Sequence, residues 1–112
     1  MSEIKRGEVY WAQLDPTIGA EIQKTRPVVV MSNTSINKAR RTIVIVPLST
    51  SAPVIPYLNV GLTGGNTARC DHIRAIDKSR LGKKIGTLST KDIDAIFEGL
   101  KAEKNPDGEA IV

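Results

Sequence analysis

Residues Pro27–Ser51 read PVVVMSNTSINKARRTIVIVPLSTS, two runs of β-branched residues separated by a polar, basic stretch. The runs are Pro27–Met31 and Ile43–Val46. Uninterrupted apolar runs of this length are typical of strands that are covered on both faces, so each run predicts a buried strand. Ser32–Arg41, between them, is predicted to be a loop or one short helical turn. Pro47 is expected to end the second strand, because proline has no N–H to donate to a sheet.

Further strands are expected on both sides of this pair. Gly7–Leu14 is rich in Val, Tyr and Trp, and the turn-forming pair Asp15-Pro16 is expected to end it. Shorter strands are predicted downstream at Tyr57–Leu62, Ala68–Asp77 and Lys83–Leu88.

The C-terminal stretch predicts one amphipathic helix. Ser89 with Asp92 three residues later is a capping-box pattern, with Leu88 placed to pack across the cap. Asn105-Pro106 is expected to end the helix. The helix is expected to bury one face. The apolar residues whose spacing places them on that face are Ile93, Ile96, Phe97 and Leu100. These elements together predict a mainly β fold, a small, partly closed antiparallel barrel with a C-terminal helix packed on it.

Length and composition exclude several classes of protein. The chain has 112 residues, 12.1 kDa, 40% hydrophobic and 25% charged residues, so we expect one domain over residues 1–112. The polar start, Met1–Arg6, does not resemble a secretory signal, and no apolar run approaches the roughly 20 residues that span a bilayer. Cys70 cannot form an intrachain disulfide, and with His72 it is too small a set for a tetrahedral zinc site. We therefore expect a cytoplasmic protein with no membrane segment and no metal.

The charge of the chain is unevenly distributed. The formal net charge is +4, and residues 1–84 carry thirteen basic and six acidic side chains. Such a surface attracts polyanions such as nucleic acid, although ordinary solvation explains it equally well. The two apolar strands are expected to leave more apolar surface than one small core and one helix can cover. This predicts a homodimer.

Several common chemistries have no support in the sequence. It contains no GxxxxGK[ST] loop, no GxGxxG turn and no closely spaced carboxylate pair on a strand. Cys70 is expected to be a small buried packing residue instead of a nucleophile activated by His72. Of the neighbours Tyr10 and Trp11, strand alternation sends one inward, and Trp11 is expected to pack in the core.

Arginine, aspartate and hydroxyl side chains at strand ends remain as candidates for a site. Arg26 directly precedes Pro27, which favours an extended backbone and limits where the guanidinium can point. Arg69 and Asp71 are two apart in a predicted strand, so they are expected to share a face. A surface ion pair is the simpler interpretation of these two on composition alone. The hydroxyl residues at the exit of the second apolar strand are Ser49, Thr50 and Ser51.

A series of short blocks runs along nearly the whole chain: Arg6-Gly7-Glu8, Leu14-Asp15-Pro16-Thr17, Gly19, Glu21, Arg26-Pro27, Val46–Ser51 and Ala68–Leu81. In content and order these blocks resemble the MazF/PemK family of toxins, and the PemK (Kid) branch most closely. Ala20 and His72 depart from residues that are frequent in the family, which bears on substrate contacts.

The resemblance implies an SH3-like, CcdB/PemK-type barrel that forms a homodimer and cleaves single-stranded RNA at short sequences. It also implies a cognate antitoxin protein whose disordered tail occupies the same groove. The catalytic residues of the family fall on Arg26, Ser49, Arg69 and Asp71. The candidate substrate-binding residues are Glu21, Lys24, Thr50, Ser51, His72 and Arg74.

This residue set suits RNA cleavage, because RNA carries its own nucleophile in the 2′-OH and needs neither metal nor cofactor. Asp71 is the candidate base, Arg26 and Arg69 would hold the phosphate oxygens, and Ser49 would donate a hydrogen bond to the same phosphate. The expected products carry a 2′,3′-cyclic phosphate and a 5′-hydroxyl. Two alternatives stay open: a non-enzymatic toxin of the same barrel that binds DNA gyrase, and a non-catalytic nucleic-acid-binding SH3-like module.

Overall fold

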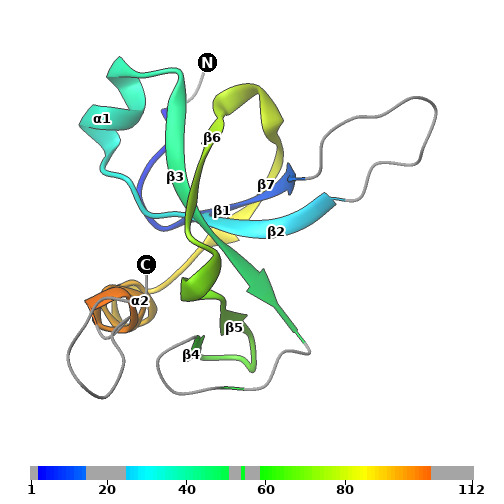
Figure 1. Cartoon of the computed structure of the whole chain (residues 1–112), viewed down its shortest axis with the longest axis vertical. Coiled ribbons are helices and arrows are strands. Elements are labelled where there is room, and N and C mark those ends of the chain that lie inside the picture. Colours follow the sequence, from blue (N-terminus) through cyan, green and yellow to red (C-terminus); the bar gives the residue numbers. More distant parts are fainter. Residues whose placement is uncertain (1–2, 15–24, 51–53, 55–58, 102–112) are drawn as a thin grey trace.

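Seven antiparallel strands, two α-helices and two 3-10 helices make up the described part of the chain (Figure 1). The computed structural model describes residues 3–14, 25–50, 54 and 59–101. The elements are β1 (Glu8–Gln13), β2 (Thr25–Val30), α1 (Thr34–Ala39), β3 (Thr42–Ser49), β4 (Val60–Gly61), β5 (Thr67–Ala68), η1 (Cys70–His72), β6 (Arg74–Asp77), η2 (Lys78–Arg80), β7 (Leu81–Thr87) and α2 (Thr90–Lys101).

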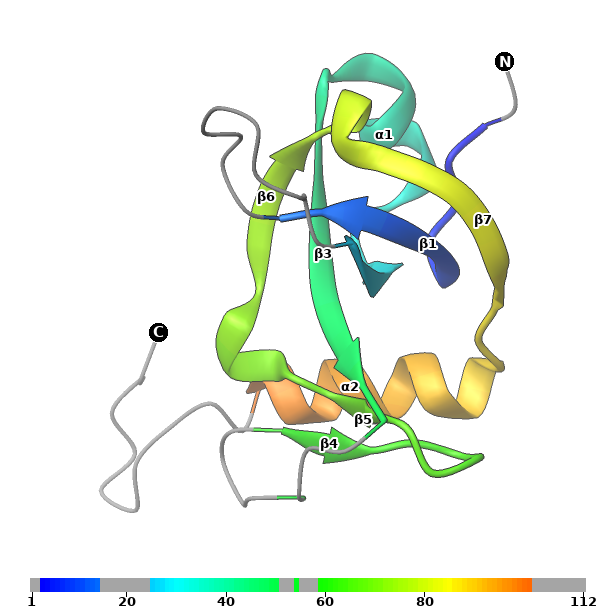
Figure 2. The same ribbon diagram turned by 90° about the vertical axis from the view of Figure 1, so that its right-hand side faces the viewer.

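The strands run in the order β4-β5-β3-β2-β1-β7, and β6 pairs with β3 beside this path. β3 is the longest strand and has three described partners: β2, β6 along its first half, and β5 at its end. Figure 2 shows β7 curving around the sheet toward α2, which lies across one end of it. The expected mainly β, partly closed barrel with a C-terminal helix is confirmed.

The two apolar runs are buried on both faces, as expected. On β2, Val29 contributes to the core cluster that α2 covers through Ile96, whereas Val28 and Val30 face a second cluster on the opposite side of the sheet. All three valines have zero exposure. The chain itself therefore covers both faces of these strands, and the premise that they leave apolar surface for a second chain is wrong.

The segment expected to be one strand, Ala68–Asp77, is interrupted by η1. β5 ends at Ala68, where the chain pairs with the end of β3, and β6 begins at Arg74 beside Ile45. Between these two pairings the chain has the five residues Arg69–Ile73, whereas β3 has only Val46 and Pro47, so the extra residues must leave the ladder. They form the turn of 3-10 helix, and Cys70 points into the core with zero exposure, as expected for a packing residue.

The other predicted elements are found with adjusted ends. Ser32–Arg41 contains the short helix α1, whose cap Asn33 accepts a hydrogen bond from Ile36 N at 2.8 Å. The last predicted strand is β7, which begins at Leu81. Of the strand expected at Tyr57–Leu62, the structure describes pairing at Val60–Gly61. Asp15-Pro16, Tyr57-Leu58 and the expected helix stop at Asn105-Pro106 lie outside the described residues.

Helix α2 has half of the expected capping box. Asp92 N donates to Ser89 Oγ at 3.2 Å, but the Asp92 carboxylate does not reach back to the cap. Its Oδ1 instead accepts from Thr63 N at 3.1 Å and from Thr63 Oγ1 at 2.9 Å. Asp92 is 6% exposed, and a buried carboxylate needs such donors. The interaction ties the turn between β4 and β5 to the start of the helix.

Trp11 points away from the core, contrary to expectation. Val9 and Trp11 share one face of β1, but only Val9 is covered by the cluster under α2, and Trp11 is 42% exposed. Tyr10 points to the other face and packs against the second core cluster. Its hydroxyl donates to Glu8 Oε1 at 2.9 Å, and Lys84 Nζ lies 2.5 Å from Glu8 Oε2.

The hydrogen bonds and the ion pair among Glu8, Tyr10 and Lys84 affect the pKa values of Glu8 and Tyr10. Burial acts to raise the pKa of Glu8, but the hydrogen bonds from Lys84, Lys5 N and Tyr10 outweigh it and hold that pKa below its usual value. Burial together with the bond to the Glu8 carboxylate raises the pKa of Tyr10 to about 12.

The raised pKa of Tyr10 predicts an alkaline loss of stability. An ordinary phenol ionises near pH 10, so the folded state holds this proton more tightly than the unfolded state. The resulting stabilisation is complete below pH 10 and is lost as the pH rises toward 12. In chemical denaturation between pH 9 and 12, the wild type should lose up to about 2 kcal/mol more than Tyr10→Phe does. Parallel losses in the two proteins would contradict this assignment.

The packing of α2 on η1 predicts an effect at Gly99. A Cβ on Gly99 would lie 2.3 Å from Val60 Cγ2 and 3.1 Å from Cys70 Sγ. Gly99→Ala should therefore lower the free energy of unfolding by about 1 to 3 kcal/mol, although alanine favours a helix. Gly86→Ala is the control, because a Cβ at Gly86 meets nothing within 4 Å. An increase in stability for Gly99→Ala would show that α2 lies further from Val60 than it does in this structure.

Candidate active site

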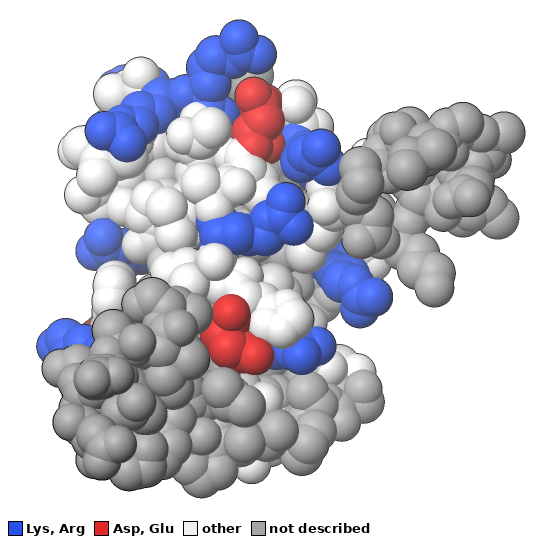
Figure 3. All heavy atoms as spheres, in the orientation of Figure 1, with Lys and Arg blue, Asp and Glu red and all other residues white. Residues whose placement is uncertain are grey.

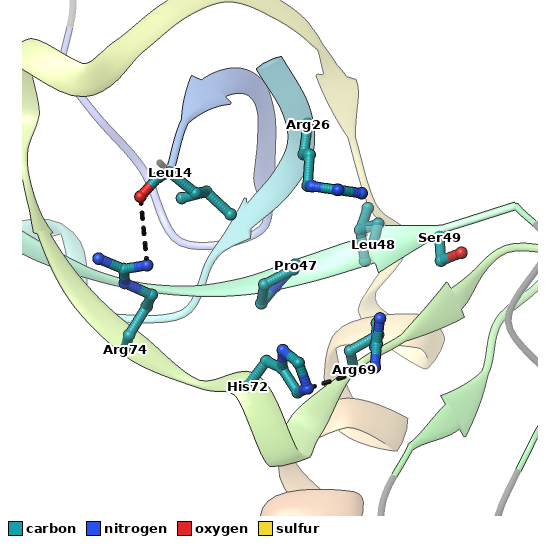
Figure 4. A pocket seen from close by; sticks show the side chains of 8 residues that line it. All are labelled: Leu14, Arg26, Pro47, Leu48, Ser49, Arg69, His72 and Arg74. Carbon is teal, nitrogen blue, oxygen red and sulfur yellow. Dashed lines mark hydrogen bonds between the residues drawn. The ribbon is translucent and has the colours of Figure 1, made fainter. Parts of the chain in front are cut away.

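A cavity of about 280 Å³ opens at the junction of five elements (Figure 4). These are the end of β1, the start of β2, the end of β3, η1 and the start of β6. Its wall is polar and basic, with an apolar floor. The lining residues are Leu14, Arg26, Pro47, Leu48, Ser49, Arg69, His72 and Arg74. Five of the residues that sequence reasoning proposed for a site are therefore brought together by the fold: Arg26, Ser49, Arg69, His72 and Arg74.

Arg26 enters the cavity from the first residues of β2. It pairs with Ala12 of β1 in the antiparallel register, and its side chain is exposed. Figure 4 shows its guanidinium pointing toward Leu48 and Ser49 of β3. Because Pro27 follows directly and Val28 is fully buried, the backbone that carries Arg26 is held in place.

The end of β3 forms the floor and one wall of the cavity. Pro47 lies opposite Val28 in the sheet, and its carbonyl accepts from Arg69 N at 2.8 Å. Contrary to expectation, the strand continues past this proline to Ser49, which pairs with Thr67 of β5. Pro47 is tolerated within the strand because its carbonyl still bonds to a neighbour while its missing N–H is not required there.

Arg69, Asp71 and His72 form a polar cluster on η1. Arg69 Nη2 lies 3.2 Å from His72 Nε2, and the same ring nitrogen lies 3.4 Å from Asp71 Oδ2. The expectation that Arg69 and Asp71 share a strand face is wrong, because Asp71 is in the 3-10 helix. The Asp71 carboxylate meets the imidazole, and His72, not Asp71, is among the residues that line the cavity.

Two buried polar atoms of this cluster have no hydrogen-bond partner among the described residues. They are Arg69 Nε and Asp71 Oδ1. Burial of a polar atom without a hydrogen bond costs about 1 to 3 kcal/mol, so each such atom in a fold requires an explanation. Both atoms belong to residues that sequence reasoning proposed for a site.

The cavity wall is strongly basic. Three guanidinium groups line it, from Arg26, Arg69 and Arg74, and the Asp71 carboxylate, whose side chain is 23% exposed, lies beside His72. Arg74 also donates to Leu14 O at 3.4 Å, which joins the start of β6 to the end of β1. Basic side chains also predominate over acidic ones on the face drawn in Figure 3. Such a wall attracts and orients an anionic group such as a phosphodiester.

The remaining candidate residues for substrate binding are Thr50, Glu21, Lys24 and Ser51. Thr50 is exposed and lines a second groove, and Glu21, Lys24 and Ser51 lie outside the described residues. The second groove has a volume of about 330 Å³ and also contains Trp11 and Ile85, which are 42% and 48% exposed. Sequence reasoning missed this groove, because alternation along a strand does not reveal where the covering helix ends.

No group of three or more His, Cys, Asp or Glu side chains within the described residues is arranged to hold a metal ion. None of the described helices is both long enough and apolar enough to cross a membrane.

Comparison with known proteins gives a consistent result. A family model described as "PemK-like, MazF-like toxin of type II toxin-antitoxin system" matches residues 5–103. Endoribonuclease PemK of Escherichia coli is 36% identical over 92 residues, which are 75% of this chain and 69% of that protein. Endoribonuclease MazF9 of Mycobacterium tuberculosis is 33% identical over 110 residues, 88% of this chain and 93% of that protein.

The fold agrees with these sequence matches. The solved structure of an endoribonuclease in complex with its cognate antitoxin, from a mycobacterial species, superimposes with a TM-score of 0.71 at 24% sequence identity. The likeness covers 87% of this chain and 90% of that one. Sequence and fold together establish that the chain belongs to the PemK-like, MazF-like toxin family of type II toxin–antitoxin systems.

Proposed function

We propose that this toxin is an endoribonuclease that cleaves single-stranded RNA at short sequences without a metal ion or cofactor. The observation that supports it most directly is the basic cavity, which gathers Arg26, Ser49 and Arg69 from separate parts of the chain around a space of about 280 Å³. The relatives named endoribonucleases support the same activity.

In the proposed reaction the RNA 2′-OH attacks the adjacent phosphorus, and the bond to the 5′-oxygen breaks. Arg26 and Arg69 bind the phosphate oxygens from two sides and stabilise the negative charge that develops there. Ser49 donates a hydrogen bond to the same phosphate. A guanidinium does not give up its proton at neutral pH, so the arginines act through charge. The products carry a 2′,3′-cyclic phosphate and a 5′-hydroxyl.

Asp71 is the proposed base for the 2′-OH proton. Its side chain is 23% exposed, and its Oδ2 lies 3.4 Å from Nε2 of His72, whose side chain lines the cavity. Flanking nucleotides are proposed to contact Glu21, Lys24, Thr50, Ser51, His72 and Arg74.

The partners that we propose are a cognate antitoxin protein and a second copy of the chain, in the cytoplasm, where RNA is available. The exposed Trp11 and Ile85 in the second groove provide apolar surface for a protein contact. An antitoxin accompanies the mycobacterial endoribonuclease in its solved structure, which supports the same kind of partner for this chain.

The proposed mechanism predicts a strict dependence on the 2′-OH. Purified protein incubated with a long RNA in EDTA should give sharp cuts, because the nucleophile belongs to the substrate and no metal is required. An oligonucleotide with one 2′-deoxy substitution at the mapped cut should stay intact. Fragment ends are identified by end-labelling, with the cyclic phosphate as the diagnostic product.

The alternatives give different results in the same assay. Complete cleavage of the deoxy substrate would rule out 2′-OH attack. RNA binding without cleavage would indicate a nucleic-acid-binding module, and trapping of DNA gyrase without cleavage would indicate a gyrase-directed toxin.

Substitution of the cavity residues predicts a loss of rate with the fold retained. Arg26→Ala and Asp71→Ala should each lower single-turnover cleavage by about 100-fold or more, because they remove charge stabilisation and proton acceptance respectively. Lys91→Ala and Asp94→Asn, on the exposed side of α2, are matched controls and should cleave like the wild type. Wild-type rates for both cavity variants would place the active site elsewhere.

A further inference from the structure

The proposed cleavage requires two proton transfers, and the roles assigned so far account for one. The 2′-OH loses its proton to Asp71, but the departing 5′-oxygen must also gain one. A carboxylate that accepts the 2′-OH proton does not also donate a proton to the 5′-oxygen in the same step, so a second group that carries a proton is needed.

His72 is the side chain in the described wall of the cavity that is chemically suited to this task. The other ionisable groups that line it are the guanidiniums of Arg26, Arg69 and Arg74, which hold their protons too tightly to act as acids. An imidazole in general titrates between pH 5 and 8, and a general acid works best when it titrates near the working pH. The chain contains one histidine, so no other imidazole in the same chain can substitute.

The contacts of His72 Nε2 place this atom between two partners with opposite requirements. Arg69 Nη2, 3.2 Å away, can only donate, so it favours an unprotonated nitrogen. Asp71 Oδ2, 3.4 Å away, can only accept when ionised, so it favours a protonated one. Figure 4 shows the ring beside Arg69 on the wall of the cavity. The geometry therefore places the imidazole between the proposed base and a guanidinium proposed to bind the phosphate.

A bound phosphodiester would lie among several charged groups. The charged groups around the ring are Arg69 and Asp71 on its own segment, Arg26 of β2 and Arg74 of β6. The RNA phosphate would bring a negative charge to this wall, and a negative charge near an imidazole favours its protonated form.

We propose that His72 is the general acid of the reaction, a role that rests on the proposed endoribonuclease function. The 2′-oxygen forms its bond to phosphorus as its proton passes to the Asp71 carboxylate. The bond between phosphorus and the 5′-oxygen breaks, its electron pair stays on that oxygen, and the imidazolium gives its proton to it. His72 leaves the cycle neutral and Asp71 protonated, and exchange with water restores both.

The decisive experiment changes the leaving group. Once the cut position is mapped, an oligonucleotide is made in which the bridging 5′-oxygen at that position is replaced by sulfur, which departs as a thiolate without needing a proton. His72→Gln and His72→Ala should cleave the oxygen substrate about 100-fold or more slowly than the wild type. Both should cleave the sulfur substrate within about 10-fold of it. Asp71→Ala should remain slow on both, because its step is unchanged.

The two histidine variants separate an acid from a positioning residue. Glutamine can still hydrogen-bond to Arg69 and Asp71 but cannot deliver a proton at neutral pH. If His72 only positions its neighbours, His72→Gln should restore the rate on the oxygen substrate, and this outcome would overturn the proposal. The proposal would also be overturned if each variant were slowed by the same factor on the sulfur substrate as on the oxygen substrate. If the wild type cut neither substrate, the proposed function itself would fail.

A measurement independent of turnover tests the charge argument. The single imidazole can be followed by NMR as the pH is varied, in the free protein and with a saturating 2′-deoxy oligonucleotide, which binds but has no nucleophile. The titration midpoint should move to higher pH in the complex. A midpoint that is unchanged or lower would contradict proton uptake on binding. In single-turnover kinetics, the fall in wild-type rate at alkaline pH should disappear in His72→Gln.

Discussion

The segment from β5 to β6 pairs with β3 but has more residues than β3 offers it. This mismatch in length determines where η1 leaves the sheet and where its side chains lie. β5 pairs with the end of β3 and β6 with its first half, but the five residues Arg69–Ile73 must fit opposite only Val46 and Pro47. The excess residues leave the ladder as η1. Cys70 holds this turn against α2 from the inside, and Pro47 O holds Arg69 N from the side. The chemical groups of η1 are thus displayed at a corner that is supported on two sides by buried structure, which is the support that a catalytic group requires.

The electrostatics of the corner are consistent with an anionic substrate. Three guanidiniums line the cavity, while the Asp71 carboxylate lies beside His72. Elsewhere the protein satisfies its buried carboxylates: Glu8 accepts from Tyr10 and Lys84, and Asp92 accepts from Thr63. At η1 it leaves Arg69 Nε and Asp71 Oδ1 without partners among the described residues. The contrast within one small fold sets this corner apart from the rest of the described structure.

The basic cavity and the apolar groove are neighbours, because Leu48 of β3 contributes to both. One is polar and suited to phosphate, whereas the other exposes Trp11 and Ile85 and is suited to a protein chain. A partner that binds along the groove would therefore lie next to the proposed catalytic residues. This adjacency offers a physical route by which an antitoxin could block RNA, without any change in the shape of the barrel.

The sequence by itself determined the elements whose signals are local. The β-branched runs became β2 and β3, and the periodic apolar face became α2, because each pattern reflects burial that one element experiences along its own length. Tertiary structure alone decided the break between β5 and β6, the outward position of Trp11 and the contact of Asp71 with His72. These depend on how many residues one strand offers another and on where a helix stops covering a sheet. Such quantities are set by pairing between distant segments, which no local pattern of residues contains.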